Sequence, residues 1–261
     1  MGLVENIASY NTINVRIEEE ICFLQIHRPE SQNAINAELI EDMNSVLNTY
    51  SDQIKVVVLE GSPEVFCFGA DFNELQQSFD TGNVAENQDP GPLYDLWHTL
   101  ATGPFITVAH VQGKANAGGI GFVSACDIVL AQENTVFSLS ELLFGLMPAC
   151  VLPFLIRRIG HAKANYMTLI TQPINAQQAL EWGLVDAIEP NSENLLRKQL
   201  LRLRRLNKSG IQRYKNYMSE LSDGLRNDKE KALAANKSVF SDADNLEKIA
   251  RYVKTGQFPW E

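Results

Sequence analysis

The stretch Gly113–Gly145, GKANAGGIGFVSACDIVLAQENTVFSLSELLFG, decides the fold that we expect for this chain. A glycine pair, Gly118 and Gly119, opens a run of small and apolar residues; a strand pattern, IVLA, follows, and then a segment with one acid, Glu141. Glycine lets a backbone approach a ligand closely, and the free amides of a helix start favour negative charge. The stretch therefore predicts a place for an oxyanion beside a proton-transferring carboxylate, although close helix packing explains a glycine pair equally often.

Strand and helix patterns alternate before this stretch. Apolar or alternating runs predict strands at Ile13–Glu18, Ile21–His27, Val56–Leu59 and Phe105–Val111, and helical spacing marks Asn36–Tyr50 and Leu93–Leu100. Such alternation is typical of parallel crossovers, so we expect an α/β fold. After Pro148 the pattern becomes helical and ends in two long helices. We place a boundary near Pro190, with a core over 1–190 and a helical region over 191–261.

Composition and charge narrow the classes of function. The chain has 261 residues, 45% of them apolar, and a net charge of −10, which argues against a general binder of nucleic acid or anionic membranes. No run approaches a membrane span, and Met1–Asn11 lacks a signal-peptide layout. Four cysteines without C-x-x-C spacing indicate free thiols in a reducing cytosol, so we expect a cytoplasmic protein with no metal site.

A second glycine turn, in FCFGADFNEL, repeats the layout of strand, glycine and helix start. The amides of Ala70 and Gly118 at these two turns are candidates to converge on one carbonyl oxygen, as an enolate requires. Asp71 is a candidate acid, but with Glu74 three residues later it also forms a D-x-x-E helix start, and we favour the capping role.

Glu141 lies among apolar residues in FSLSELLFG, where burial raises a carboxyl pKa towards the range of a general acid or base. A surface glutamate on a half-exposed turn explains the same pattern equally well. A G-x-S-x-G elbow, a phosphate loop and a dinucleotide fingerprint are all absent from the sequence, which argues against hydride transfer and nucleotide hydrolysis.

The segment Leu195–Lys215 is basic and contains no acid. A solvated helix face is the usual explanation of such a run. In an acidic protein it is also a candidate docking surface for an acidic partner or an anionic cofactor tail. The candidate docking residues are Arg197, Arg204, Arg205 and Lys208.

Six segments in order along nearly the whole chain resemble the crotonase (enoyl-CoA hydratase/isomerase) superfamily: HRPESQNAIN, FCFGADF, GKANAGGIGFVSACDIVLA, FSLSELLFGLMP, INAQQALEWGLVD and SVFSDADNLEKIARYV. Further segments, including PLYDLW and YVKTGQFPWE, resemble one branch, the dehydratase of bacterial polyketide β-branching cassettes. The resemblance implies loss of water from a 3-hydroxy-3-methylglutaryl thioester on an acyl carrier protein, which gives the 3-methylglutaconyl thioester without a separate cofactor.

The resemblance also implies a spiral of ββα units and a C-terminal helical region that commonly supports trimers. It assigns the oxyanion amides to Ala70 and Gly118, and it matches the second of two hydratase glutamates to Glu141. The first glutamate falls on Gly121, so this chain departs from the two-glutamate pattern. We interpret the glycine as space for a branched C3 atom, and we expect Glu141 to remove the C2 proton and return it to the departing hydroxyl.

Several assignments stay open at this point. Candidates to bind the far carboxylate of the substrate are Tyr94, His98, Lys114 and Asn116. The cassette decarboxylase, a CoA-dependent hydratase of branched-chain breakdown and an inactive binding module remain alternatives to the dehydratase. A hydratase of that kind is expected to keep a glutamate at position 121, and an inactive module does not need both oxyanion turns.

Overall fold

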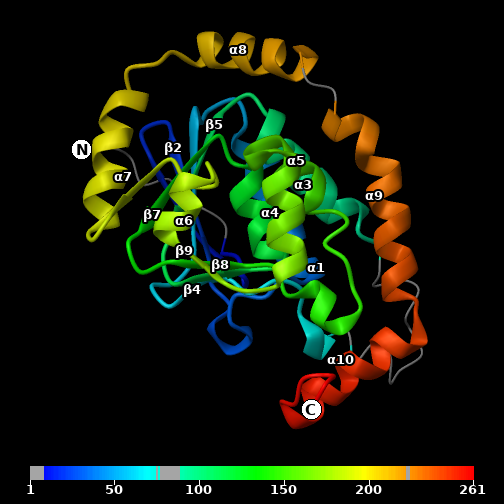
Figure 1. Cartoon of the computed structure of the whole chain (residues 1–261). Coiled ribbons are helices and arrows are strands. Elements are labelled where there is room, and N and C mark those ends of the chain that lie inside the picture. The colour runs from blue at the N-terminus through cyan, green and yellow to red at the C-terminus, as the bar shows by residue number, and fades with distance from the viewer. Residues whose placement is uncertain (1–8, 75, 77–88, 222–223) are drawn as a thin grey trace.

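Two β-sheets lie at the centre of the molecule, and helices surround them (Figure 1). The computed structural model describes residues 9–74, 76, 89–221 and 224–261. The larger sheet has the order β1-β2-β3-β5-β7-β10, with β1 and β2 antiparallel and the others parallel. Its strands are β1 (Ile13–Glu18), β2 (Ile21–Ile26), β3 (Val56–Glu60), β5 (Ile106–Val111), β7 (Ile128–Gln132) and β10 (Ala187–Glu189).

The smaller sheet has the order β4-β6-β8-β9, in which β4, β6 and β8 are parallel. Its strands are β4 (Val65–Cys67), β6 (Lys114–Asn116), β8 (Val136–Ser138) and β9 (Ile174–Asn175). Along the chain, each long strand β3, β5 and β7 is followed by a short strand of this second sheet and then by helical structure. This arrangement confirms the predicted α/β spiral of ββα units.

Alternating side chains of the large sheet build two separate cores. Val57 and Leu59 point to the face covered by α1 (Ala37–Tyr50), α3 (Gly91–Thr102), α4 (Gly118–Ala125) and α5 (Leu152–Ile170). Val56 and Val58 point to the opposite face, where they pack with leucines of α7 (Ser192–Leu203). Both faces are apolar because a parallel sheet is covered by helices on both sides.

The helical region differs from the predicted two long helices. After α6 (Ala176–Glu181) and α7, it continues as α8 (Lys208–Leu221), α9 (Gly224–Phe240) and α10 (Ala243–Thr255). Polar caps explain two of the breaks: the Asn207 side chain accepts from the Gly210 amide, and Asp242 accepts from the amides of Asp244 and Asn245. The first helix beyond Pro190 packs on the sheet, whereas α8 and α9 run along the outside of the molecule (Figure 1).

The cysteines are free thiols, as the sequence indicated. All four are buried, and burial raises the pKa of each thiol to about 12. In the described part of the chain, none of the helices combines the length and the apolar character that a membrane span requires.

A buried ion pair attaches α8 to the core. The Lys215 ammonium is 4% exposed and donates to both carboxylate oxygens of Asp127, at 2.5 and 2.7 Å. Asp127 also accepts from the Thr107 amide and hydroxyl, which fixes it beside β5. Burial lowers the Lys215 pKa, and Asp127 opposes this by holding the charged form.

Replacement of Lys215 by methionine should destabilise the protein by about 3–5 kcal/mol, because it leaves the Asp127 carboxylate without its buried partner. Urea unfolding measures the change, and hydrogen exchange should localise it to α8. The matched control is Lys229→Met, which removes an exposed pair with Asp95 and should cost less than about 1 kcal/mol. Equal losses in the two variants would contradict an anchoring role for Lys215.

Candidate active site

The two glycine turns predicted to carry the oxyanion amides touch in the structure. Gly69, with φ +97°, lies so close to the second turn that a Cβ there would be 2.7 Å from the Ala117 Cβ and 3.2 Å from the Gly118 nitrogen. Ile35 holds the first turn in an extended bridge, since its amide donates to the Gly69 carbonyl and its carbonyl accepts from the Asp71 amide. Among the described residues, the Ala70 and Gly118 amides have no acceptor, so both are free to bind a ligand oxygen.

The second turn holds a strained backbone. Ala117 has φ 51° and ψ −119°, a conformation that glycine normally occupies, and its amide donates to the Ser138 carbonyl of β8. Gly119 is required next to it, because a Cβ there would lie 2.4 Å from the Cys67 carbonyl oxygen. These contacts fix the direction of the first amides of α4.

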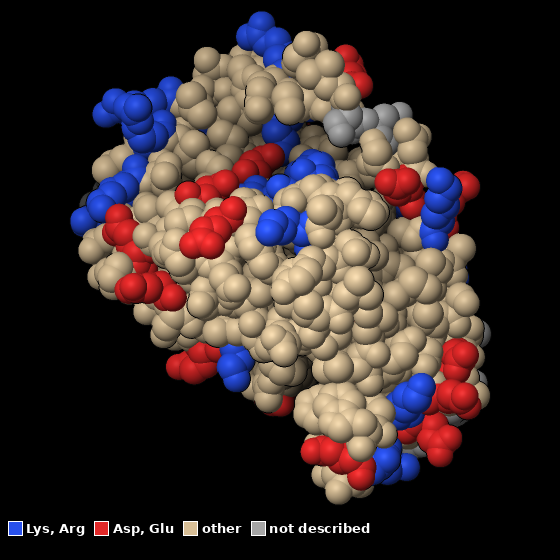
Figure 2. All heavy atoms as spheres, in the orientation of Figure 1, with Lys and Arg blue, Asp and Glu red and all other residues tan. Residues whose placement is uncertain are grey.

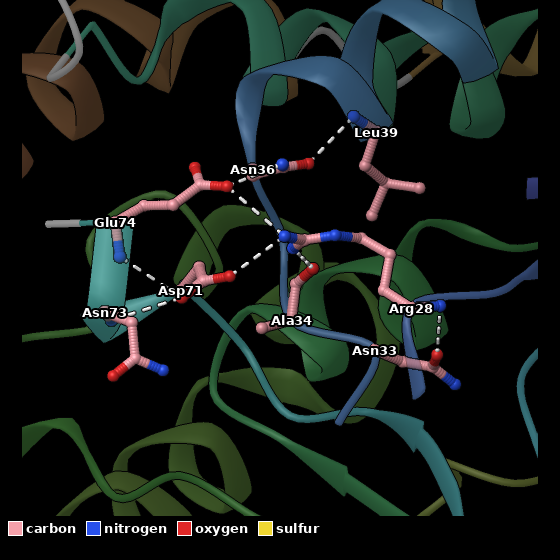
Figure 3. Close-up of polar contacts among 8 residues, drawn as sticks. All are labelled: Arg28, Asn33, Ala34, Asn36, Leu39, Asp71, Asn73 and Glu74. Atoms are coloured by element: carbon pink, nitrogen blue, oxygen red, sulfur yellow. Dashed lines mark hydrogen bonds and ion pairs between the residues drawn. The ribbon is translucent and has the colours of Figure 1, made fainter. Parts of the chain in front are cut away.

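A buried arginine supports the first turn (Figure 3). The Arg28 guanidinium donates to the Ala34 carbonyl at 2.5 Å and to the Asp71 carboxylate at 3.0 Å. It also contacts Glu74 at 3.2 Å, and Asn36 donates to the same Glu74 oxygen at 2.7 Å. Because the Arg28 and Asp71 side chains are only 9% and 4% exposed, this network holds the loop after β2 against the Ala70 turn.

Asp71 is a helix cap, as the sequence favoured. Its Oδ1 accepts from the amides of Asn73 and Glu74, and its Oδ2 is paired with Arg28. Both oxygens are therefore occupied by structural partners. We accordingly assign Asp71 to the support of the turn, and leave it out of the chemistry that we propose.

Glu141 begins a short 3-10 helix, η2 (Glu141–Phe144), and carries an unpaired buried oxygen. Its Oε2 is inaccessible and has no hydrogen-bond partner among the described residues. Burial raises the Glu141 pKa to about 7, and hydrogen bonds from the Glu141 and Ser140 amides only partly oppose the rise. A carboxyl group with this pKa can act as either acid or base near neutral pH.

Asn116 connects the two oxyanion turns to the Glu141 segment. Its Nδ2 donates to the Ser140 hydroxyl at 3.1 Å and lies 3.4 Å from the Phe68 carbonyl, while its Oδ1 accepts from the Ser138 hydroxyl at 2.7 Å. Its amide is thus engaged with protein groups. The geometry gives Asn116 a positioning role, in place of the predicted contact with the substrate.

The C-terminal helix covers the same segments. Phe144 of η2 packs edge-on against Phe72, which follows Asp71, and against Tyr252 of α10. Asn245 of α10 donates to the Gly145 carbonyl at 3.1 Å. The C-terminal helix therefore joins the Ala70 turn to the Glu141 segment, a role that local sequence pattern did not indicate.

Tyr94 and His98 were predicted to contact the substrate, and the structure places both on α3. Tyr94 is fully buried and its hydroxyl donates to the Leu225 carbonyl at 2.6 Å, so it belongs to the core between α3 and α9. Burial raises the Tyr94 pKa. His98 is half-buried, with Nδ1 3.4 Å from the Thr102 hydroxyl, and burial lowers its pKa. Lys114 is exposed on β6.

Gly121 does not leave open space, which corrects the interpretation given above. A Cβ at this position would lie 2.4–2.6 Å from three atoms of the Trp97 indole. The ring of Trp97, 1% exposed, fills the volume that we had expected a branched substrate to use. The sequence did not single out Trp97 for this role, because the residue occupies one of several apolar positions of α3.

Some side chains of the basic segment Leu195–Lys215 contact other protein groups and are therefore not available to bind a partner. Lys208 is wrong as a docking residue, because its ammonium donates to the Ser51 and Ile54 carbonyls, both at 2.5 Å. Arg204 lies 3.6 Å from Glu19, whereas Arg197 and Arg205 are exposed. Arg197 and Arg204 line a groove beside α7 together with Glu18, Glu193 and several apolar side chains. Figure 2 shows basic side chains gathered near α7, on the sheet face opposite α4.

One other polar cluster lies apart from these turns. Among the described residues, Glu60, His110 and Glu193 form the group whose ligand atoms lie within 4.8 Å of one another. His110 is occupied on both ring nitrogens, at 2.8 Å from Glu60 and 2.9 Å from the Ser192 hydroxyl. The cluster joins β3, β5 and the start of α7.

Two free amides on touching turns, connected through Asn116 to the segment of a carboxyl group with a raised pKa, suit the stabilisation of a thioester enolate and the transfer of its proton. The ββα spiral with such turns is the arrangement of acyl-thioester enzymes of the crotonase type. The sequence profile of the enoyl-CoA hydratase/isomerase family matches residues 16–261, and the chain belongs to that family. It is an enzyme of the hydratase and dehydratase type, a hydro-lyase.

Two relatives and one solved structure describe the similarity. The bacillaene synthase dehydratase PksH of Bacillus subtilis is 57% identical over 258 residues, which cover 98% of this chain and 99% of the relative. A crystal structure of a polyketide biosynthesis enoyl-CoA hydratase from the same species superimposes with a TM-score of 0.94, covering 96% of this chain and 100% of that one. The 2,3-dehydroadipyl-CoA hydratase of Escherichia coli is 33% identical over 68% of this chain and 69% of its own length.

The raised pKa of Glu141 predicts a dependence of stability on pH. The folded state holds a proton on Glu141 up to about pH 7, whereas the unfolded chain releases it near the ordinary value of 4.5. Stability from this group is therefore complete below about pH 4.5 and is lost as the pH rises to about 7. Glu141→Gln removes the ionisation, so it should match the wild type at pH 4 and exceed it at pH 8 by on the order of 3 kcal/mol.

Urea unfolding at the two pH values checks this expectation, with Glu133→Gln as the exposed control. A difference between Glu141→Gln and wild type that stays constant with pH would contradict the raised pKa.

Proposed function

We propose that this enzyme dehydrates a 3-hydroxy-3-methylglutaryl thioester carried on an acyl carrier protein, giving the 3-methylglutaconyl thioester during polyketide β-branching. The supporting observation is the pairing of two free amides, at Ala70 and Gly118, with one buried carboxyl group of pKa about 7. High identity over nearly the full length to a dehydratase of bacillaene synthase supports the polyketide context.

In the proposed mechanism, the thioester carbonyl oxygen accepts from the Ala70 and Gly118 amides. Each donor stabilises the enolate oxygen by on the order of 3 kcal/mol. Glu141 takes the C2 proton, and the electron pair of that C–H bond moves towards the carbonyl. When the C3–O bond breaks, the pair forms the C2=C3 bond, and Glu141 returns the proton to the departing hydroxyl as water. A single carboxyl group suffices because its pKa lies near neutrality.

The alternatives within this fold make different demands on the same residues. A decarboxylase generates its enolate by losing carbon dioxide, so it needs a proton donor for the resulting carbanion but no base at C2, and loss of a C2 proton to Glu141 is a step that the dehydratase alone requires. A two-glutamate hydratase needs a carboxylate at position 121, where this chain has glycine and the Trp97 ring fills the space. Both observations favour the single-acid dehydratase.

An intact-protein mass assay with the hydroxymethylglutaryl group on an acyl carrier protein tests the reaction. The wild type should convert the carrier species to one lighter by a single water, with a rate that rises with pH through about 7 because the base must be ionised. Glu141→Gln should lose at least about 100-fold in rate, whereas Glu133→Gln should keep it. Release of carbon dioxide, or full turnover by Glu141→Gln, would reject the proposal.

We further propose that the carrier protein docks on exposed arginines of the basic segment, Arg197 and Arg205. Carrier proteins of acidic character are attracted by such residues, and the charge of the rest of this chain is negative. The groove beside Arg197 adds apolar contact area next to the charges. Lys208 and Lys215 are omitted because both are held by protein groups.

The double variant Arg197→Glu/Arg205→Glu should lower kcat/KM for the carrier-bound substrate about 10-fold or more, and leave that for a short pantetheine thioester unchanged. The control Lys163→Glu/Lys231→Glu reverses two exposed charges on α5 and α9. Loss on both substrates, or loss in the control as well, would reject docking on these two arginines.

We also propose that the chain forms a homo-oligomer, a trimer, through its C-terminal helices. One stripe of α8 exposes large apolar side chains at helical spacing: Tyr214, Tyr217, Met218 and Leu221. Light scattering of Tyr217→Asp should show a particle smaller than the wild type. A monomeric wild type would reject the oligomer.

A further inference from the structure

A buried histidine lies between two carboxylates at the start of α7, apart from the two oxyanion turns. His110 is 2% exposed, and its Nδ1 is 2.8 Å from the Glu60 carboxylate, whose side chain is 19% exposed. Glu193 supplies a third ligand atom, and the three atoms lie within 4.8 Å of one another. One imidazole nitrogen and two carboxylate oxygens at such distances are a ligand set for a divalent transition-metal ion.

Neighbouring strands fix two of these ligands. Glu60 ends β3 and is the register partner of His110 on β5. Each follows by two residues a valine, Val58 or Val108, that packs with the leucines of α7, so both side chains point to the α7 face of the sheet. Glu193 reaches them from the first turn of α7. The ligand set therefore joins two strands to the helix that covers them.

The two carboxylates have lone pairs to spare. In the part of the chain that the structure describes, the Glu193 side chain has no basic partner and no hydrogen-bond donor, and the Glu60 side chain is paired with His110 alone. The dipole of α7 explains an acid in its first turn, but it does not explain the approach of that acid to a second carboxylate, which is repulsive. A bound cation supplies the missing attraction.

Ser192 orients the imidazole from its other side. The Ser192 hydroxyl lies 2.9 Å from Nε2 of His110, and it accepts from the Gln112 side-chain amide at 3.2 Å. A hydroxyl can donate to an unprotonated Nε2 or accept from a protonated one, so it satisfies both tautomers of the ring. Without a metal, Nδ1 keeps its hydrogen and donates to Glu60. With a metal on Nδ1, the hydrogen is on Nε2 and Ser192 accepts it, which is the usual support of a metal-binding histidine.

The same bonds have the order of a Ser–His–Glu triad, but they lack the access that a nucleophile needs. Ser192 is 1% exposed, so a substrate does not reach its hydroxyl. A metal ion has a shorter way in, because Glu193 is exposed and Glu60 is half-buried. The burial therefore favours a metal site over a hydrolytic one.

We propose that Glu60, His110 and Glu193 bind one Zn²⁺ ion, with water completing the coordination. The site lies on the sheet face opposite α4, so the ion takes no part in the dehydration proposed above. Its effect is to fasten the start of α7 to β3 and β5. Cysteine spacing predicted no metal site in this chain, and the present ligands come together only when three distant segments meet.

Isothermal titration of tag-free protein with Zn²⁺ tests the site. The wild type should bind one equivalent. Glu193→Gln removes one ligand charge at an exposed position and should bind at least about 10-fold more weakly. The matched control Glu133→Gln, which changes another exposed glutamate, should bind as the wild type does. Mg²⁺ should compete poorly, because it prefers a shell of oxygen ligands.

Two further measurements keep the test independent of any one variant. Zn²⁺ should raise the melting temperature of the wild type and of Glu133→Gln, but not that of Glu193→Gln. Anomalous diffraction from wild-type crystals grown with Zn²⁺ should place the ion among the three ligand atoms, at about 2.0–2.2 Å from each. Glu141→Gln should keep full affinity, because the carboxyl group of the candidate active site is not a ligand.

Three results would overturn the inference. They are a wild type that binds no Zn²⁺, affinity that survives in both Glu60→Gln and Glu193→Gln, and an ion found on one of the four buried thiols. None of these measurements uses the dehydration reaction, so their outcome is separate from that of the proposed function.

Discussion

The contact between two backbone turns, at Gly69 and Gly118, is the constraint on which the site depends. Their approach leaves no room for a side chain at Gly69, and it leaves the Ala70 and Gly118 amides without protein acceptors. The hydrogens of the two free N–H groups carry partial positive charges that repel each other. Other contacts must therefore hold the two turns together. The buried Arg28 network supports the first turn, and the Asn116 amide ties both turns to the segment of Glu141.

The properties of the other buried polar groups, Glu141 and Trp97, depend on the exclusion of water. Burial gives Glu141 a pKa of about 7, and the same burial leaves the Trp97 N–H without a solvent partner. The C-terminal helix contributes by packing Tyr252 on Phe144, next to Phe72 of the first turn. The region that the sequence assigned to assembly thus also packs on the 3-10 helix that begins at Glu141.

The sequence pattern predicted those elements that form through contacts between residues close together in the chain. The strands β1 and β2, the helix capped by Asn36 and the capping role of Asp71 all follow from hydrophobic period and from side chains that bond amides two or three residues further on. Four helices follow Pro190 in the described part of the chain where the sequence predicted two, because polar caps within a continuous amphipathic pattern do not reveal the direction of the chain. Lys208 and Tyr94 were misassigned because their partners, backbone carbonyls of distant segments, carry no sequence signal.

The sequence alone therefore determined the alternation of strands and helices, the two glycine turns and the lone acid at Glu141, since glycine, apolar period and an isolated carboxylate are properties of single segments. Only the tertiary structure decided what surrounds them. The gap at Gly121 is filled by Trp97 from another helix, and Asn116 is turned inward to protein groups. These outcomes depend on packing between segments far apart in the chain, where the free volume beside one residue is set by the side chain of another.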